Sequence, residues 1–327
     1  MMHAIRQHAF GPPETLAYED VPDPVPAPDQ VRIAVEAAGV HLIDTSIRRG
    51  EAGGPYPLPD LPMTPGREVA GVVDRVGSGA PDTWLGRRVV AHLGPASAGY
   101  ATLAVAPVAA LHPVPDGLDA QAAVAMIGTG RTAMGILEVA DLTAEDAVLV
   151  TAAAGGLGTL LVQAARGAGA AVVGLAGGAA KVEQVRANGA TGAVDYLVPG
   201  WPDAVGAALG DRAPTVLLDG VGGEAGRTAL ELLAPGGRVV MFGWSSGEIL
   251  ALTSGDLYAR GLTASAAVGP RLLQRPGGLR ELEGRALDEA AAGRLVPAVH
   301  SFPLAEAAAA HAALEARATT GKVVLVP

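Results

Sequence analysis

The sequence predicts an α/β fold in which a parallel, doubly wound sheet is joined to a second domain of short β-strands. Three observations predict this architecture. An apolar strand runs directly into a glycine-rich turn over residues 148–158, and strands and helices then alternate as far as residue 243. Before residue 120, by contrast, short strands are separated by turns rich in proline and glycine.

The glycine-rich turn is typical of a phosphate-binding loop. A strand, a tight turn and a helix follow one another within and just after residues 148–158. This order places unpaired backbone N–H groups and the positive end of a helix dipole at one point. The glycine spacing fits the dinucleotide fingerprint G-x-G-x-x-G if Ala153 replaces its first glycine. Gly155 would then let the backbone approach a pyrophosphate, and Gly158 would let the helix pack closely on the strand.

The elements after this turn alternate in type. We predict strands at 171–175, 193–196, 215–219 and 238–243, and helices at 179–188 and 224–233. Strands that alternate with helices of this length form a parallel sheet with helices on both faces. Together with the glycine-rich turn, this pattern predicts a domain that binds a nucleotide cofactor.

The two ends of the chain have a different pattern. We predict strands at 31–35, 69–76, 87–91 and 100–105, in an antiparallel barrel or sandwich. Asp119 is placed to cap a helix that enters the middle region. After residue 265 we predict helices at 279–292 and 304–316 and a last strand at 322–326. We therefore expect one domain from residues 1–120 and 266–327 and a second from residues 121–265.

Composition restricts the function further. The chain has 327 residues, of which 50% are hydrophobic and 17% charged, as in a compact globular protein with room for two domains. The net charge of −10 argues against nucleic acid or an anionic membrane as a partner. The absence of cysteine excludes disulfides and thiolate zinc sites. Residues 1–6 lack the apolar stretch of a secretion signal, so we expect a cytoplasmic protein.

The motifs that carry a family resemblance are spread over the whole chain. They are Phe10–Glu14, Ala37–Val40, Asp44, Ile47–Gly50, Pro65–Val73, Ala152–Gly158, Asp219–Gly223 and Thr319–Leu325. With them the chain resembles the medium-chain dehydrogenase/reductase superfamily, specifically its zinc-free quinone oxidoreductase (zeta-crystallin-like) branch. The resemblance implies a GroES-like β-barrel domain and a Rossmann domain.

The resemblance also implies an activity. It is that of an NADPH-dependent oxidoreductase that transfers hydride to a quinone or an α,β-unsaturated carbonyl, needs no zinc and forms a homodimer. Two alternatives stay open: an enoyl-thioester reductase, and a crystallin-like protein that binds NADPH without turnover. The substrate is a small molecule that the sequence does not identify.

The chain departs from the family at the substrate side. Zinc alcohol dehydrogenases carry cysteine at the position of His41 and histidine at that of Arg67, so no metal is expected. A metal bound by His41 and Glu68 is the alternative, although two ligands make a poor site. Quinone reductases usually have asparagine at the position of His41 and tyrosine at that of Ser46.

Four residues are candidates for contact with the substrate. His41 can donate a hydrogen bond to the oxygen on which negative charge develops, and it titrates near neutrality. Thr132 matches a family threonine near the nicotinamide, Tyr56 could cover the cleft, and Arg131 could bind a carboxylate or phosphate. The alternatives are structural: a loop hydrogen bond, helix packing, a rigid turn and a surface salt bridge, respectively.

The cofactor side indicates NADPH rather than NADH. An NAD enzyme commonly has an acidic residue after the second strand, and this chain has none in residues 175–181. Lys181 and Tyr196 match family positions near the 2′-phosphate, although Lys181 could also be a solvated helix residue. The predicted cofactor-binding residues are Ala154, Gly155, Gly156, Leu157, Gly158, Lys181, Tyr196, Val221, Phe242 and Gly243.

Overall fold

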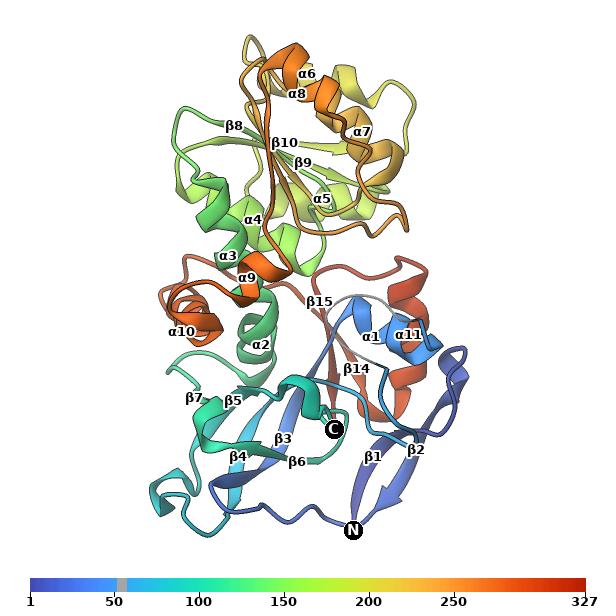
Figure 1. Cartoon of the computed structure of the whole chain (residues 1–327), viewed down its shortest axis with the longest axis vertical. Coiled ribbons are helices and arrows are strands. Elements are labelled where there is room, and N and C mark those ends of the chain that lie inside the picture. Colours follow the sequence, from blue (N-terminus) through green and yellow to red (C-terminus); the bar gives the residue numbers. More distant parts are fainter. Residues whose placement is uncertain (52–57) are drawn as a thin grey trace. The chain divides into compact units, whose positions relative to one another are not determined.

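The computed structural model describes residues 1–51 and 58–327, which form two compact units (Figure 1). The first unit comprises Met1–Thr129, Glu283–Ala291 and Pro297–Pro327, and the second comprises Gly130–Leu282 and Ala292–Val296. The first unit thus continues past residue 120, where the sequence analysis places a domain boundary.

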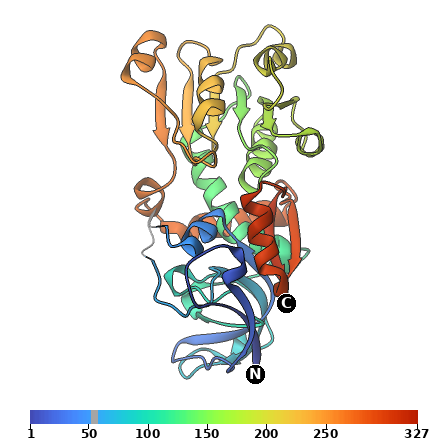
Figure 2. The same ribbon diagram turned by 90° about the vertical axis from the view of Figure 1, so that its right-hand side faces the viewer.

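The second unit is built on a six-stranded sheet in which every pair is parallel. Its strands, in the order in which they lie in the sheet, are β10 (Gly192–Asp195), β9 (Ala171–Ala176), β8 (Ala147–Val150), β11 (Val216–Asp219), β12 (Arg238–Met241) and β13 (Thr263–Ala266). This is the doubly wound order 3-2-1-4-5-6, so the prediction is confirmed. The strand β13, at one edge of the sheet and orange in Figure 2, was not predicted. Its sequence, Thr-Ala-Ser-Ala, lacks the large β-branched residues that favour strands.

Helices cover both faces of this sheet (Figures 1 and 2). The helices that lie wholly in this unit are α3 (Arg131–Ala140), α4 (Gly156–Gly167), α5 (Ala179–Ala187), α6 (Trp201–Leu209), α7 (Gly223–Glu231), α8 (Ser254–Arg260) and α9 (Pro270–Leu273). The central strand β8 is consequently buried along its whole length. The helices α6 and α8 were not predicted, although Pro202 in the first turn of α6 is a typical helix-start signal.

The first unit contains a mostly antiparallel sheet and a separate hairpin. The hairpin pairs β1 (Met2–Gln7) with β2 (Leu16–Val21). The sheet has the order β14 (Val299–Pro303), β15 (Lys322–Val326), β3 (Gln30–Val40), β4 (Glu68–Val76), β5 (Arg88–His92) and β7 (Leu111–Pro113). The long strand β3 pairs with β6 (Leu103–Pro107) at its start and with β15 at its end.

The predicted strands of this unit are found with small shifts. The one expected at 100–105 starts only at Leu103, because Ala101 instead forms an isolated bridge with Ala4. The apolar inner faces of these strands form one core cluster that includes Ile33, Val73 and Leu325. This architecture agrees with the β-barrel domain that the family resemblance implies.

Four further helices are α1 (Leu42–Arg49), α2 (Ala120–Ala125), α10 (Gly278–Ala291) and α11 (Ala307–Glu315). Asp119 caps α2 as predicted, since its Oδ1 accepts from the Ala122 N–H at 2.7 Å. Within the described residues, the helical stretch Ala120–Ala140 is long and apolar enough to cross a membrane, but 72% of its apolar window is buried inside the protein. Such burial is typical of a core helix.

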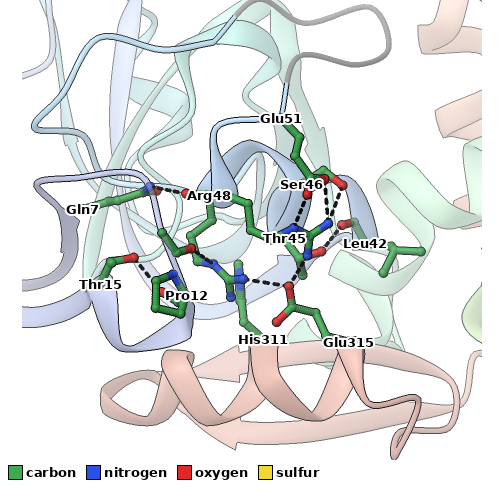
Figure 3. Close-up of polar contacts among 12 residues, drawn as sticks. Gln7, Pro12, Thr15, Leu42, Thr45, Ser46, Arg48, Glu51, His311 and Glu315 are labelled. Atoms are coloured by element: carbon green, nitrogen blue, oxygen red, sulfur yellow. Dashed lines mark hydrogen bonds and ion pairs between the residues drawn. The ribbon is translucent and has the colours of Figure 1, made fainter. Parts of the chain in front are cut away.

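A charge network joins α1 to α11 inside the first unit (Figure 3). Arg48 on α1 is only 1% exposed, and its guanidinium donates to the Gly11 carbonyl at 3.1 Å and to Glu315 of α11 at 2.7 Å. Glu315 also pairs with Arg49. The Arg48 carbonyl in turn accepts from the Gln7 side-chain amide at 2.9 Å. The Glu315 carboxylate therefore neutralises the buried Arg48 guanidinium, which the Gly11 carbonyl also holds in place.

The substitution Glu315→Ala should lower the free energy of unfolding by about 2–3 kcal/mol, because it leaves the buried Arg48 without its carboxylate. Urea unfolding measures this change. Glu19→Ala, which breaks the exposed pair with His8, is the matched control and should cost less than about 0.5 kcal/mol. Equal losses in the two variants would show that the Arg48 charge is not effectively buried.

Candidate functional site

The glycine-rich turn of the second unit is shaped to bind an anion. The helix α4 begins at Gly156, so the N–H groups of its first turn have no acceptor within the helix. A Cβ atom at Gly158 would overlap the Ala152 carbonyl oxygen and lie 2.6 Å from the Ala153 Cα. Only glycine therefore allows α4 to approach the turn this closely, as the glycine spacing predicts.

A buried carboxylate fixes the loops on either side of this turn. Asp219, at the end of β11, has no exposed surface and accepts from the Thr151 hydroxyl at 2.8 Å and from the Val221 N–H at 3.1 Å. The Thr151 hydroxyl oxygen accepts from the Gly220 N–H at 2.8 Å. Since β8 and β11 are the strands at which the sheet order reverses, this bridge lies at the usual cofactor position of such folds. The sequence analysis missed Thr151, although a polar residue directly after a buried strand is a recognisable signal.

Other predicted cofactor residues lie at the ends of neighbouring parallel strands. A Cβ atom at Gly177 would lie 3.3 Å from the Tyr196 hydroxyl, so Tyr196 lies against the end of β9. A Cβ atom at Gly220 would overlap the Phe242 ring, and one at Gly243 would lie 3.0 Å from the Gly220 carbonyl oxygen. Lys181 lies in the first turn of α5, directly after β9. Residues from four different loops are thus placed at the same edge of the sheet.

A second polar cluster lies in the first unit, at the ends of three adjacent strands. His41 Nε2 lies 2.7 Å from Glu68 Oε1, and Lys322 Nζ lies 2.9 Å from Glu68 Oε2. Lys322 Nζ is also 3.1 Å from His41 Nε2. Glu68 is 0% exposed, and the side chains of Lys322 and His41 are 5% and 24% exposed. Only His41 therefore has substantial access to solvent.

Two glycines make room for this cluster. A Cβ atom at Gly39 or Gly128 would overlap a carboxylate oxygen of Glu68. Burial opposes ionisation of Glu68, but the neighbouring His41 and Lys322 outweigh burial and hold the pKa of this carboxyl below its ordinary value. The cluster is thus built around a permanent negative charge.

A buried network supports His41 from the other side. The carboxylate of Asp44 accepts from the His41 backbone N–H at 2.9 Å and from the Tyr100 hydroxyl at 3.1 Å. The same hydroxyl lies 3.2 Å from His311 Nε2, and Arg67 lies 3.4 Å from Asp44. Burial raises the pKa of Tyr100 well above its ordinary value and lowers that of His311 to about 4. The Asp44 carboxylate therefore fixes the turn that carries His41, and Tyr100 and His311 take part in this network as neutral groups.

The other predicted substrate residues are placed as follows. Thr132 and Arg131 both lie in the first turn of α3, in the second unit. Arg131 is buried rather than on the surface, so the alternative of a surface salt bridge is wrong. Ser46 accepts from Arg49 at 3.2 Å. Tyr56 lies outside the described residues.

A pocket of about 620 Å³ lies in the first unit and was not predicted. Its polar lining includes Arg6, Arg67 and Asp60, and its apolar lining includes Ile47 and Met63. Arg6 also donates to the Thr64 hydroxyl at 3.3 Å. A pocket that combines charged and apolar walls can hold a small polar organic molecule.

Comparison with known proteins agrees with this geometry. Residues 27–116 match the alcohol dehydrogenase GroES-like domain, and residues 156–280 match the zinc-binding dehydrogenase family. A quinone oxidoreductase of Pseudomonas aeruginosa is 33% identical over 330 residues, with both chains covered completely. A 2-haloacrylate reductase of Burkholderia is 33% identical over 337 residues, covering 100% of this chain and 99% of the relative.

A solved structure of Escherichia coli quinone oxidoreductase complexed with NADPH superimposes with a TM-score of 0.86 at 29% identity, covering 99% of this chain and 100% of that one. The chain belongs to the medium-chain dehydrogenase/reductase superfamily, in its quinone oxidoreductase branch. As a member of this branch, the protein is an oxidoreductase. No group of three or more histidine, aspartate or glutamate side chains that could hold a metal occurs in the part of this oxidoreductase that the structure describes.

Acid should destabilise the protein in the pH range in which His311 titrates. The unfolded chain binds a proton near pH 6.5 and the folded chain only near pH 4, so the unfolded state binds more protons between these values. The free energy of unfolding should then fall by about 3 kcal/mol as the pH drops from 6.5 to 4.

Urea unfolding at a series of pH values measures this slope. His311→Gln should flatten it, whereas His8→Gln, at an exposed histidine, should leave it as in the wild type. A wild-type slope in His311→Gln would show that His311 is not the titrating group.

Proposed function

We propose that the protein is an NADPH-dependent, zinc-independent reductase of quinones or α,β-unsaturated carbonyls. The observation that carries this proposal is the glycine turn before α4, where the first-turn N–H groups have no acceptor within the helix, next to a strand end without an acidic residue. The names of the relatives, quinone oxidoreductase and 2-haloacrylate reductase, support an electron-poor quinone or alkene as the acceptor. NADPH consumption with quinones, enones and enoyl pantetheine thioesters tests the proposal and separates it from the thioester-reductase and non-catalytic alternatives.

The residues at the sheet edge fit NADPH. The first-turn N–H groups of α4 would hold the pyrophosphate, and Gly158 allows that approach. Gly177 and Gly178 at the end of β9 leave space for a 2′-phosphate, with Lys181 and Tyr196 beside them. When bound, the nicotinamide supplies the hydride. The protein's own task is to orient the acceptor and to stabilise the oxygen that becomes negative.

His41 is our candidate for that stabilisation. Its ring lies at the N-terminus of α1, is partly exposed, and is fixed on one side by the Glu68 cluster and on the other by Asp44. A hydrogen bond from its ring to the substrate oxygen would strengthen as charge develops there. Thr132, Arg131 and Tyr56 stay proposed substrate contacts.

The chemistry of the His41 cluster disfavours zinc. The ammonium group of Lys322 lies within 3.1 Å of both His41 Nε2 and Glu68 Oε2, so a cation already neutralises Glu68 beside the two possible metal ligands. Arg67 follows at the position where zinc enzymes carry histidine. Zinc would have to displace a buried ammonium to bind two ligands only.

We also propose a homodimer in the cytoplasm. The edge strand β13 has a ladder partner on one side only among the described strands. Three large side chains near it along the chain, Trp244, Ile249 and Tyr258, are exposed. A second copy that covered this region would remove both an unpaired edge and apolar surface from water.

NADPH should raise the melting temperature more than NADH at equal concentration, because the ligand that binds the folded state more tightly stabilises it more. Lys181→Ala should weaken NADPH about tenfold, the loss of one charge-assisted contact, and hardly affect NADH. Calorimetry measures both affinities. Arg186→Ala removes a cation from the same helix and should leave NADPH affinity unchanged. A larger shift with NADH would refute the cofactor preference.

His41→Ala should lower kcat and kcat/KM together by about 10²-fold, with NADPH affinity intact, because it removes a donor used in the transition state. His41→Asn should retain much of the activity on simple quinones, since an amide still donates. Steady-state kinetics distinguish this role from simple substrate binding, which would raise KM alone. Wild-type kinetics in both variants would exclude His41 from the active site.

Dialysis against a chelator should leave the reductase activity and the melting temperature unchanged. The reason is that Lys322 already neutralises Glu68, so no metal is needed to do so. Activity and metal content are measured before and after dialysis. Activity that is lost on dialysis and restored by zinc would contradict zinc independence.

A further inference from the structure

The helix α11 is tied to α1 at two points that are one helical turn apart. His311 and Glu315 are four residues apart on α11, so both side chains lie on the same face of that helix (Figure 3). Asp44 and Arg48 have the same spacing on α1. Glu315 pairs with Arg48 at 2.7 Å, whereas His311 reaches Asp44 through the hydroxyl of Tyr100. The first and the last turn of α1 are therefore each tied to α11.

The hydrogen bonds of the Tyr100 hydroxyl have a defined direction. The carboxylate of Asp44 can only accept, so the Tyr100 O–H donates to Asp44 Oδ2 at 3.1 Å. The Nε2 atom of His311 lies 3.2 Å from the same hydroxyl and must then donate to its oxygen. Burial lowers the pKa of His311 to about 4, so its ring is neutral and Nδ1 carries no proton. A proton on Nδ1 would leave a buried N–H group without a partner in the described part of the chain.

The surrounding backbone holds Tyr100 in place. Its N–H donates to the Pro65 carbonyl at 2.9 Å, and its carbonyl accepts from the Ile5 N–H at 2.8 Å. Gly66 has a φ of 94°, and a Cβ atom there would overlap the Tyr100 ring, so only glycine allows this packing. The Tyr100 side chain has no exposed surface. Its hydroxyl is therefore a fixed point to which both α1 and α11 are bound.

We propose that α11 positions His41 for the reaction, with His311 and Glu315 as the positioning residues. This inference rests on the proposed function, in which His41 donates a hydrogen bond to the substrate oxygen. The Asp44 carboxylate accepts from the His41 backbone N–H at 2.9 Å, so a carboxylate that Tyr100 orients also holds the residue that precedes α1. A displacement of about 1 Å at such a residue can slow a reaction about 10²-fold.

Nitrogen NMR of the His311 ring tests the direction of these hydrogen bonds without any substrate. At neutral pH the wild type should show a neutral ring with its proton on Nε2. A proton on Nδ1 would mean that Tyr100 donates to His311 and not to Asp44, and this result would overturn the proposal.

Hydrogen exchange of the His41 backbone amide tests the positioning itself. Tyr100→Phe keeps the ring but removes the hydroxyl, so the Asp44 carboxylate loses a donor and the His41 amide should exchange about tenfold faster. The Ala122 amide, which Asp119 caps elsewhere in the same unit, should keep its rate. A general loss of stability would instead accelerate both amides. That outcome, or an unchanged rate at His41, would overturn the proposal.

Variants of the two α11 residues separate hydrogen bonding from packing. His311→Leu should accelerate exchange at His41 as Tyr100→Phe does, whereas His311→Gln should keep it slow, because a side-chain amide still donates. Glu315→Ala, which releases the other end of α1, should also accelerate it relative to the reference amide. Tyr18→Phe removes an exposed hydroxyl from the same unit and is the matched control. Equally fast exchange in His311→Gln and His311→Leu would overturn the role of the hydrogen bond, and Tyr100→Phe decides it if His311→Leu does not fold.

Kinetics test whether this positioning acts on the reaction through His41. Tyr100→Phe should lower kcat about tenfold with unchanged NADPH affinity. In the His41→Ala background, the same substitution should have no further effect on kcat, because the side chain that it positions is absent. An equal loss in both backgrounds would show a general effect on the fold and would overturn the proposal.

The two proposals fail in different ways. If the wild type turns over no acceptor in the panel, the reductase function is refuted, and the role of α11 in the reaction is refuted with it. If the wild type is active but Tyr100→Phe leaves both the His41 amide and kcat unchanged, the function stands and only the positioning by α11 is refuted.

Discussion

Each unit depends on a carboxylate that is removed from water at the end of a β-strand. Glu68 starts β4 in the first unit, Asp219 ends β11 in the second, and neither has exposed surface. A buried carboxylate is costly unless charges or hydrogen bonds compensate it. The compensating groups come from distant parts of the chain, Lys322 for Glu68 and Thr151 for Asp219. Satisfying these two charges is what fixes the loops of the candidate site.

The two units contribute different chemistry to the proposed reaction. The second unit offers backbone N–H groups at α4, so it can bind a phosphate without a charged side chain in the loop. The first unit holds His41, the proposed hydrogen-bond donor to the substrate oxygen, beside the buried pair of Glu68 and Lys322. Each unit depends on a glycine at its part of the site. In the second unit, Gly158 allows α4 to approach the preceding turn closely, and in the first unit, Gly128 leaves space for the Glu68 carboxylate. Reduction of a quinone or an enone needs a hydride and stabilisation of the oxygen that becomes negative, which agrees with this division.

Much of the fold was predictable because its central strands are continuous, mostly apolar segments followed by turns that contain glycine. The strands β8, β9 and β11 are buried on both faces, and their sequences show it. The strands β13 and β14 were missed because they lie at sheet edges and need fewer apolar residues. In the candidate site, the glycine turn could be predicted because its geometry depends on residues that are neighbours in the sequence. The burial of Arg131 could not be predicted, because the exposure of a charged side chain depends on distant segments that pack around it.

The sequence by itself determined the parallel sheet, the glycine turn and the absence of cysteine ligands, because each depends on residue type and local spacing. It also identified His41 as a departure from the family. Only the tertiary structure decided what surrounds His41. The strands β3, β4 and β15 are adjacent in the sheet although they are far apart in the chain, and their pairing brings Lys322 and Glu68 to the same ring. The local sequence pattern does not show that Lys322 and Glu68 lie beside His41. Their proximity depends on the order of the strands in the sheet and on the burial of charge.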